Sequence, residues 1–112
     1  MVKNRGTKCI GEHPVSFAKQ MESLGAGELL LTSVDNEGTW NGYDLTLIEE
    51  VTSAVNIPVI VNGGAGNLNH LEMAKKQGKA SGLAMGSMVV YQKKGMGVLI
   101  NFPARAALEQ IL

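Results

Sequence analysis

The sequence predicts an α/β fold in which short parallel strands alternate with helices. Apolar runs of strand length alternate with stretches of helical periodicity, at a repeat of roughly 25 to 30 residues that suits one strand and one helix. Fourteen glycines against 4% aromatic residues fit a fold rich in tight turns between strands and helices. A chain of 112 residues, 45% of them hydrophobic, can bury one core, so we expect a single domain over residues 1–112.

Each helix is predicted from apolar spacing and from the residues at its ends. Residues 1–11 show little periodicity and are expected to form a loop that leads into the first helix. Pro14 suits the first position of that helix, and Gly25 suits its C-terminal cap. Asp44 is a good N-cap for a second helix. Further helices are expected over residues 67–77, from Gly86 and Ser87 onward, and from Pro103 to Leu112.

Three strands are predicted over residues 28–32, 58–61 and 81–85. Continuous apolar runs of this length are typical of strands covered on both faces by helices. Residues 12–112 therefore follow the order helix, strand, helix, strand, helix, strand, helix, which calls for parallel neighbours and right-handed crossovers. A closed eight-stranded barrel needs on the order of 250 residues, so the chain has room for only about half of one.

The composition favours a cytoplasmic setting and excludes several kinds of partner. Ten basic and ten acidic residues leave a formal net charge of zero, which gives no broad attraction to nucleic acid or to an anionic membrane. No leader or long apolar segment is visible, and the single cysteine, Cys9, cannot form an internal disulfide. Neither His13 nor His70 has a second ligand at metal-binding spacing, so we predict no metal and no cofactor.

The most informative segment for function is the apolar run at residues 59–61, which stops at a glycine-rich loop over residues 62–66. A loop without side-chain bulk lets backbone N–H groups converge on an anion. Gly86 and Ser87 follow the next strand in the same way, so the two loops are expected to hold one phosphate or phosphorylated small molecule. The alternative is that each glycine only makes a tight turn. The predicted binding residues are Asn62, Gly63, Gly64, Ala65, Gly66, Gly86 and Ser87.

A third loop follows the first strand and supplies polar side chains at the same end of the sheet. It contains Thr32, Asp35 and Glu37, and a carboxylate partly shielded from water is a candidate general acid or base. These three residues are the catalytic candidates. The alternative for Asp35 and Asn36 is that they cap and turn the loop. Trp40 either covers a ligand or a partner surface or has a packing role.

Four segments carry a long, ordered series of motifs. They are Gly-Ala-Gly-Glu-Leu-Leu-Leu-Thr-Ser-Val-Asp at residues 25–35, Glu-Gly-Thr at 37–39, Gly-Tyr-Asp at 42–44, and Ile-Pro-Val-Ile-Val-Asn-Gly-Gly-Ala-Gly at 57–66. In these segments the sequence resembles the cyclase subunit of imidazole glycerol phosphate synthase, and the resemblance extends from residues 3–11 to residues 101–103. It implies the C-terminal part of a TIM (β/α)8 barrel, and hence a parallel (β/α) half-barrel. The end of the chain also resembles a variant branch associated with surface-polysaccharide amidation.

The resemblance also implies a reaction of the lyase class. The family cyclase accepts ammonia from a glutaminase partner and joins it to a ribulose-linked aminoimidazole carboxamide nucleotide, which yields imidazole glycerol phosphate and aminoimidazole carboxamide ribotide. By resemblance, the two glycine loops hold one of the substrate's two phosphates, and Thr32 and Asp35 line the active-site end of a strand. The family's two principal catalytic aspartates follow its first and fifth strands, which precede this sequence. Glu37 replaces the aspartate usual in its loop.

We therefore expect a half-barrel that keeps a phosphate-binding end without the main catalytic aspartates. The alternatives are a non-catalytic, self-associating module and one half of a split cyclase that needs a partner. Three parallel strands alone expose apolar faces and strand edges. We therefore expect a homo-oligomer, dimer or larger, or association with a complementary N-terminal half-barrel. A glutaminase subunit is a further partner that the resemblance implies.

Overall fold

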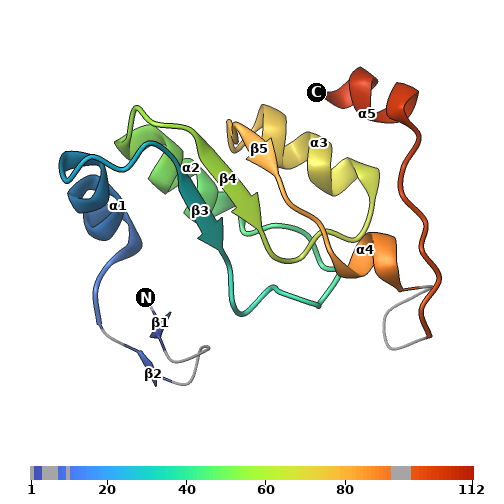
Figure 1. Ribbon diagram of the computed structural model, residues 1–112, viewed down its shortest axis with the longest axis horizontal. Helices are drawn as coiled ribbons and strands as arrows, with labels where there is room; N and C mark the ends of the chain where they lie inside the picture. The colour runs from blue at the N-terminus through green and yellow to red at the C-terminus, as the bar shows by residue number, and fades with distance from the viewer. Residues whose placement is uncertain (1, 4–7, 10, 92–96) are drawn as a thin grey trace.

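The computed structural model describes residues 2–3, 8–9, 11–91 and 97–112. These residues form a small α/β unit with two sheets, and the alternation of helices and strands predicted from the sequence is confirmed (Figure 1). In chain order the elements are β1 (Val2–Lys3), β2 (Lys8–Cys9), α1 (Pro14–Ser23), β3 (Leu29–Thr32), α2 (Leu45–Ala54), β4 (Val59–Asn62), α3 (Leu68–Lys76), β5 (Gly82–Leu83), α4 (Ser87–Val90) and α5 (Arg105–Ile111).

The main sheet has three parallel strands in the order β3-β4-β5. Leu29 pairs with Val59 and Ile60 with Gly82, so β4 is the central strand. The strand β5 covers two residues, fewer than the predicted 81–85, although the N–H of Ala84 still donates to the carbonyl of Val61 at 2.8 Å. The parallel arrangement brings the carboxyl ends of all three strands to one edge of the sheet, where the predicted loops begin.

The helix starts follow the sequence prediction for α1, α2 and α3. Pro14 is the first residue of α1, Asp44 Oδ1 accepts the N–H of Leu47 at 3.1 Å, and Asn67 caps α3. The prediction that Pro103 starts the last helix is wrong. Ala104 is extended, with ψ 143°, so helical backbone begins only at Arg105.

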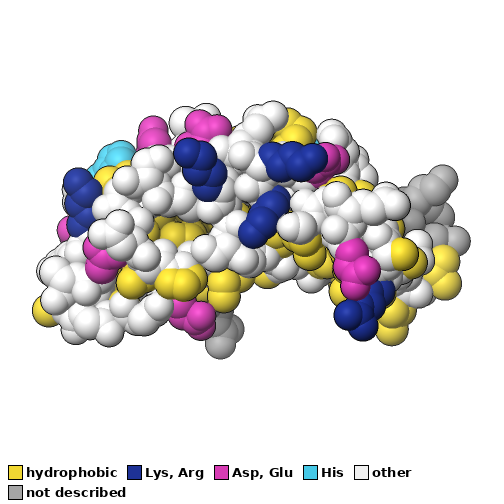
Figure 2. Space-filling view, turned by 90° about the horizontal axis from the view of Figure 1, so that it is seen from above, with side chains coloured by type: hydrophobic (Ala, Val, Ile, Leu, Met, Phe, Trp, Pro, Cys, Tyr) yellow, Lys and Arg dark blue, Asp and Glu magenta, His cyan; other side chains and the backbone are white. Residues whose placement is uncertain are grey.

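The core lies between the sheet and one layer of helices. Val51, Val59, Val61 and Leu71 are less than 2% exposed, and α2 and α3 lie behind the strands in Figure 1. Leu30, by contrast, is 66% exposed on the opposite face of β3. The prediction that the strands are covered on both faces is therefore wrong for β3, because a continuous apolar run cannot tell which of its faces this chain covers. Figure 2 shows hydrophobic side chains along the hollowed edge of the molecule.

The two ends of the chain add smaller elements. Where a loop was predicted over residues 1–11, β1 and β2 form a two-residue antiparallel ladder; residues 1, 4–7 and 10 lie outside the described part. Near the C-terminus the chain runs back along α4, with the N–H of Leu99 donating to the carbonyl of Val90 at 2.9 Å. The last helix, α5, packs on α3. None of the described helices has the length and apolar character needed to span a bilayer.

Candidate functional site

A small pocket lies at the carboxyl ends of β4 and β5, and both predicted glycine loops line it. Its volume is about 10 Å³, which is close to the space that one water-sized oxygen needs. An oxygen of a phosphate group fits such a space, with the rest of the ligand outside it. Of the seven predicted binding residues, the structure gathers six around this pocket and leaves out Gly66. The six are Asn62, Gly63, Gly64, Ala65, Gly86 and Ser87.

The first loop, residues 62–66, is held tightly against the loop that follows β3. Gly63 and Gly64 have φ angles of 104° and 105°, in the left-handed region that residues with a Cβ atom rarely adopt. A Cβ at Gly63 would lie 2.6 Å from the carbonyl oxygen of Ser33, and one at Gly64 would collide with the carbonyl oxygen of Gly42. The N–H of Gly42 donates to the carbonyl of Gly64 at 2.8 Å. Both glycines are therefore required by packing and backbone conformation.

Gly66 is also explained by packing. A Cβ at this position would collide with the carbonyl oxygen of Trp40. Its N–H donates to Nδ1 of His70 at 3.0 Å, so this donor is already used within the protein. The predicted role of Gly66 in phosphate binding has no support from these contacts, because the residue lies outside the pocket.

The second loop differs from the first. Gly86 has a φ of −130°, and a Cβ placed there would meet no atom within 4 Å. Neither packing nor a left-handed backbone requires glycine at this position. The open space beside Gly86 leaves its backbone accessible to a ligand.

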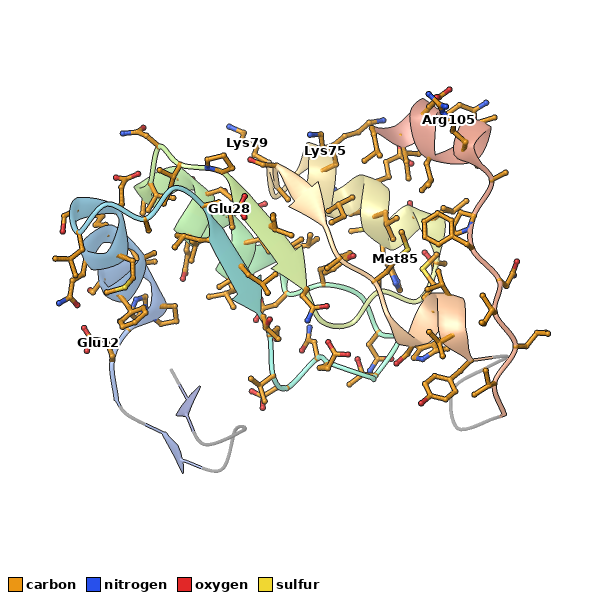
Figure 3. The ribbon with its side chains drawn as sticks, in the orientation of Figure 1. Glu12, Glu28, Lys75, Lys79, Met85 and Arg105 are labelled. Carbon is orange, nitrogen blue, oxygen red and sulfur yellow. The ribbon has the colours of Figure 1, made fainter. Side chains whose placement is uncertain are left out.

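The pocket is lined by backbone N–H groups and by one charged side chain among the described residues, the carboxylate of Glu37. The N–H groups of Gly63, Gly64, Ala65, Gly86 and Ser87 donate to no acceptor within the described residues. No described lysine or arginine lines the pocket. In Figure 3, Lys75 and Lys79 lie at the opposite end of the sheet. An anion there would be bound by backbone dipoles more than by charged side chains.

Tyr43 joins the loop after β3 to the loop after β5. Its hydroxyl donates to the carbonyl of Ala84 at 2.7 Å, and the side chain is buried. Burial, with a smaller contribution from the Glu37 carboxylate, raises the pKa of Tyr43 to about 12. The sequence analysis did not select Tyr43 as a site residue. The signal that was available was its place between Gly42 and Asp44 in a motif of the resemblance.

The three catalytic candidates do not come together. Glu37 lines the pocket with the glycine loops, whereas Asp35 is exposed and lines a separate groove of about 560 Å³ between α1 and β3. Thr32 also lines that groove, and its Oγ1 accepts a long hydrogen bond of 3.4 Å from Nδ2 of Asn62. Asn36 has the turn role that was the alternative interpretation, because its Nδ2 donates to the carbonyl of Gly42 at 3.2 Å. Among the described residues, no three His, Cys, Asp or Glu side chains are grouped as metal ligands.

Comparisons with known proteins agree with the resemblance in the sequence. Residues 1–95 match the family described as "Histidine biosynthesis protein". The chain is 41% identical over 103 residues to a protein from Leptospira borgpetersenii named "Putative imidazole glycerol phosphate synthase subunit HisF". It is 49% identical over 97 residues to an "Imidazole glycerol phosphate synthase subunit HisF" from Prochlorococcus marinus subsp. pastoris. A third relative, from Vibrio vulnificus, is "Putative imidazole glycerol phosphate synthase subunit hisF3", 37% identical over 107 residues.

These matches cover most of this chain but less than half of each relative. They cover 92%, 87% and 96% of this chain, and 40%, 38% and 41% of the three relatives. The chain therefore spans about two fifths of the length of the curated relatives that it matches.

Proposed function

The chain belongs to the histidine biosynthesis protein family, and on that basis we propose that it is a half-barrel relative of the cyclase subunit of imidazole glycerol phosphate synthase. In this proposal residues 1–112 form one half-barrel domain that binds a phosphate group of a phosphorylated sugar or nucleotide. The observation that carries it is that the loops after β4 and β5 line the same pocket with free backbone donors.

The chemistry of the pocket supports a phosphate ligand. Converging N–H groups in loops without side-chain bulk bind anions through hydrogen bonds to charged oxygens, which are stronger than neutral ones. The rigid first loop supplies donors at fixed positions, because Gly63 and Gly64 are locked by their neighbours. The open second loop admits the ligand beside Gly86.

Turnover is proposed to need more than this chain. Glu37 is the catalytic candidate that lines the pocket, whereas Thr32 and Asp35 line another groove. General acid–base catalysis needs its groups within hydrogen-bond reach of the reacting atoms. We expect a complete cyclase only when a complementary N-terminal half-barrel adds further carboxylates and a glutaminase subunit or free ammonia supplies nitrogen. Turnover of the nucleotide substrate by this chain with ammonia alone would contradict this part of the proposal.

Calorimetric titration with ribose 5-phosphate and inorganic phosphate tests the binding site. We expect saturable binding of both, which the substitution Gly86→Asp weakens about tenfold or more, because it adds a negative charge beside the bound anion. Gly27→Asp is the matched control, since Gly27 is also exposed and a Cβ there meets no atom within 4 Å. The proposed site is contradicted if the wild-type chain binds neither compound, or if the two variants lose the same amount of affinity.

A second proposal concerns association, and the open face of the sheet favours it. Leu30 is 66% exposed on that face, and within the described sheet β3 pairs only with β4, so its outer edge is free. Exposed apolar surface next to a free strand edge favours pairing with another chain. We propose that this face is covered by a second copy of the chain or by a complementary half-barrel.

Light scattering across a dilution series tests association directly. We expect the wild-type chain to be a dimer or larger, and Leu30→Lys to shift the population toward monomer by about tenfold in dissociation constant. Leu24→Lys is the control, because Leu24 is 73% exposed and lies at the C-cap of α1, outside the strands of the main sheet. A wild-type chain that is monomeric alone, and that also fails to bind a complementary half-barrel, would contradict this proposal.

A further inference from the structure

The side chain of His70 is bonded to the end of the glycine loop that follows β4. His70 lies in the first turn of α3, and its ring is half-buried. Its Nδ1 accepts the N–H of Gly66 at 3.0 Å. The carbonyl of Asn62 fixes the other end of the loop, because it accepts the N–H of Ser33 at 3.1 Å. Residues 63–65, which supply free N–H groups to the pocket, therefore lie between two fixed points.

The ring of His70 also packs against the loop that follows β3. A Cβ at Gly42 would lie 3.4 Å from Cδ2 of His70. Gly42 in turn holds the glycine loop, since its N–H donates to the carbonyl of Gly64 at 2.8 Å. The α-carbon of Gly66 is packed so closely on the carbonyl of Trp40 that a Cβ would collide with it. Of the contacts that fix Gly66, only the bond to Nδ1 depends on the proton content of a side chain.

The bond to Gly66 requires a neutral ring. An N–H donor needs a lone pair, so Nδ1 carries no proton and the proton of the neutral imidazole is on Nε2. The contact of 3.5 Å between Nε2 and Nδ2 of Asn67 then joins two donors and contributes no hydrogen bond. In an imidazolium both ring nitrogens are donors, so Nδ1 and the N–H of Gly66 would repel each other. Histidine is the side chain whose ordinary protonation falls between about pH 5 and pH 8, so mild acid breaks this contact.

The charged groups around His70 make no bond with its ring. Among the described residues, the polar contacts of the ring are with Gly66 and Asn67. α3 packs on α2, β5 and α5, and the ring faces the loop after β3. The titratable side chains of these elements are Asp35, Glu37, Tyr43 and Asp44 in the loop after β3, Glu49 and Glu50 on α2, Glu72, Lys75 and Lys76 on α3, and Arg105 and Glu109 on α5. Titration of the ring itself is therefore the direct route by which pH reaches the N–H of Gly66.

We propose that His70 is a positioning residue for the phosphate site. As the neutral imidazole it fixes Gly66, and it thereby holds the N–H groups of residues 63–65 in the arrangement that binds an anion. Protonation of the ring releases Gly66 and weakens anion binding. This role rests on the proposed phosphate site and adds a pH dependence to it. The expected sign is opposite to that of charge attraction, because a positive ring would by itself strengthen the binding of an anion.

The contact can be tested without a ligand. Nuclear magnetic resonance follows the ring carbons of His70 and the backbone amides of the loop as the pH falls from about 8 to about 5.5. We expect the amide resonances of Gly66 and of residues 63–65 to move with the midpoint of the His70 ring. His70→Asn keeps an acceptor, because Oδ1 of asparagine can replace Nδ1, but it does not titrate. The loop resonances of this variant should stay constant. Constant loop resonances in the wild-type chain while its ring titrates would overturn the role of His70.

Calorimetric titration with inorganic sulfate measures the effect on binding. Sulfate keeps both of its charges over this pH range, whereas phosphate gains a proton. We expect the wild-type chain to bind sulfate about threefold to tenfold more weakly at about pH 5.5 than at about pH 8, as the loss of one hydrogen bond predicts. His70→Asn should bind sulfate equally at both pH values. In Glu37→Gln, which removes the titrating carboxylate from the pocket, the wild-type pH dependence should remain.

His13→Asn is the matched control. His13 is the other histidine of the chain, and its Nδ1 also accepts a backbone N–H, that of Val15 at 3.2 Å. It caps α1, which is separated from α3 by α2 in Figure 1. This variant should therefore keep the wild-type loss of sulfate affinity at low pH. Far-ultraviolet circular dichroism checks that each variant folds.

The outcomes separate the role of His70 from the phosphate site itself. Sulfate binding that is equal at the two pH values, or stronger at the lower one, overturns the role of His70 and leaves the phosphate site standing. An equal pH dependence in the wild-type chain and in His70→Asn does the same. If the wild-type chain binds neither sulfate nor ribose 5-phosphate at about pH 8, the phosphate site is contradicted and the role of His70 in it falls as well.

Discussion

The two glycine loops at the carboxyl end of the sheet look alike in sequence but differ in what requires their glycines. In the loop after β4, Gly63 and Gly64 sit at positive φ and touch the backbone of the loop after β3. In the loop after β5, a Cβ atom placed on Gly86 would have no other atom within 4 Å. The first loop is therefore a packing element that also presents N–H groups, and the second is an open wall. Glycines of one motif can thus serve stability in one place and ligand access in another.

Adding one methyl group to each loop compares them directly, and the largest expected effect is in the loop after β4. Gly64→Ala should destabilise the protein by about 3 kcal/mol, because it combines a left-handed backbone with a collision against Gly42. Gly86→Ala should change the free energy of unfolding by no more than about 0.5 kcal/mol. Urea unfolding of the two variants measures both values. Similar losses in the two would break the distinction between the loops.

The next effect concerns the link between the loops. Tyr43→Phe removes the hydrogen bond to the carbonyl of Ala84 and should cost about 1 kcal/mol. Because Ala84 leads into the second loop, we also expect weaker phosphate binding in this variant. Calorimetry and urea unfolding give the two quantities. Lost stability with unchanged phosphate affinity would mean that the second loop does not depend on this contact.

Tyr43 also predicts a pH dependence. Its pKa is raised from 10.0 to about 12, so the folded state favours the neutral phenol. This contribution to stability is fully present below pH 10 and is lost as the pH rises toward 12. The wild-type chain should lose more stability over that range than Tyr43→Phe does, as measured by unfolding at each pH. Parallel curves for the two proteins would contradict the assignment.

The smallest expected effect is on phosphate affinity when the charge of Glu37 is removed. Glu37 lines the pocket and is exposed, so its charge opposes a bound anion only through water. Glu37→Gln should therefore strengthen phosphate binding by roughly twofold to fivefold at low salt, and less at high salt. Glu49→Gln, on the exposed side of α2, is the control and should leave the affinity unchanged. A weaker affinity in Glu37→Gln would indicate that this side chain supports the ligand.

Most of the fold was predictable because its signals are local. Pro14, Asp44 and Asn67 mark helix starts through backbone geometry and capping, which depend on a few neighbouring residues. Leu30 shows the limit of such signals. Its apolar character predicted burial, but burial depends on what lies across the sheet, and in this structure nothing described covers that face.

The candidate site was predictable in part for a similar reason. Residues 62–65 and 86–87 follow the ends of neighbouring parallel strands, and this topology alone places them in one pocket. The grouping of Asp35 with Glu37 was not confirmed, since a loop can send close neighbours to different grooves. Tyr43 was missed because its sequence signal was its place in the Gly-Tyr-Asp motif alone, and its hydrogen-bond partner lies 41 residues away.

The central position of β4 has a consequence for how the chain folds during synthesis. Parallel strands pair only across a crossover, so no strand of the main sheet can form an early hairpin with its neighbour. On a ribosome, β4 emerges with a partner already made in β3, but its second edge stays bare until Gly82 and Leu83 emerge. The loop after β4 is thus completed before the loop after β5. The nascent chain acquires its rigid set of N–H donors first and its open wall last.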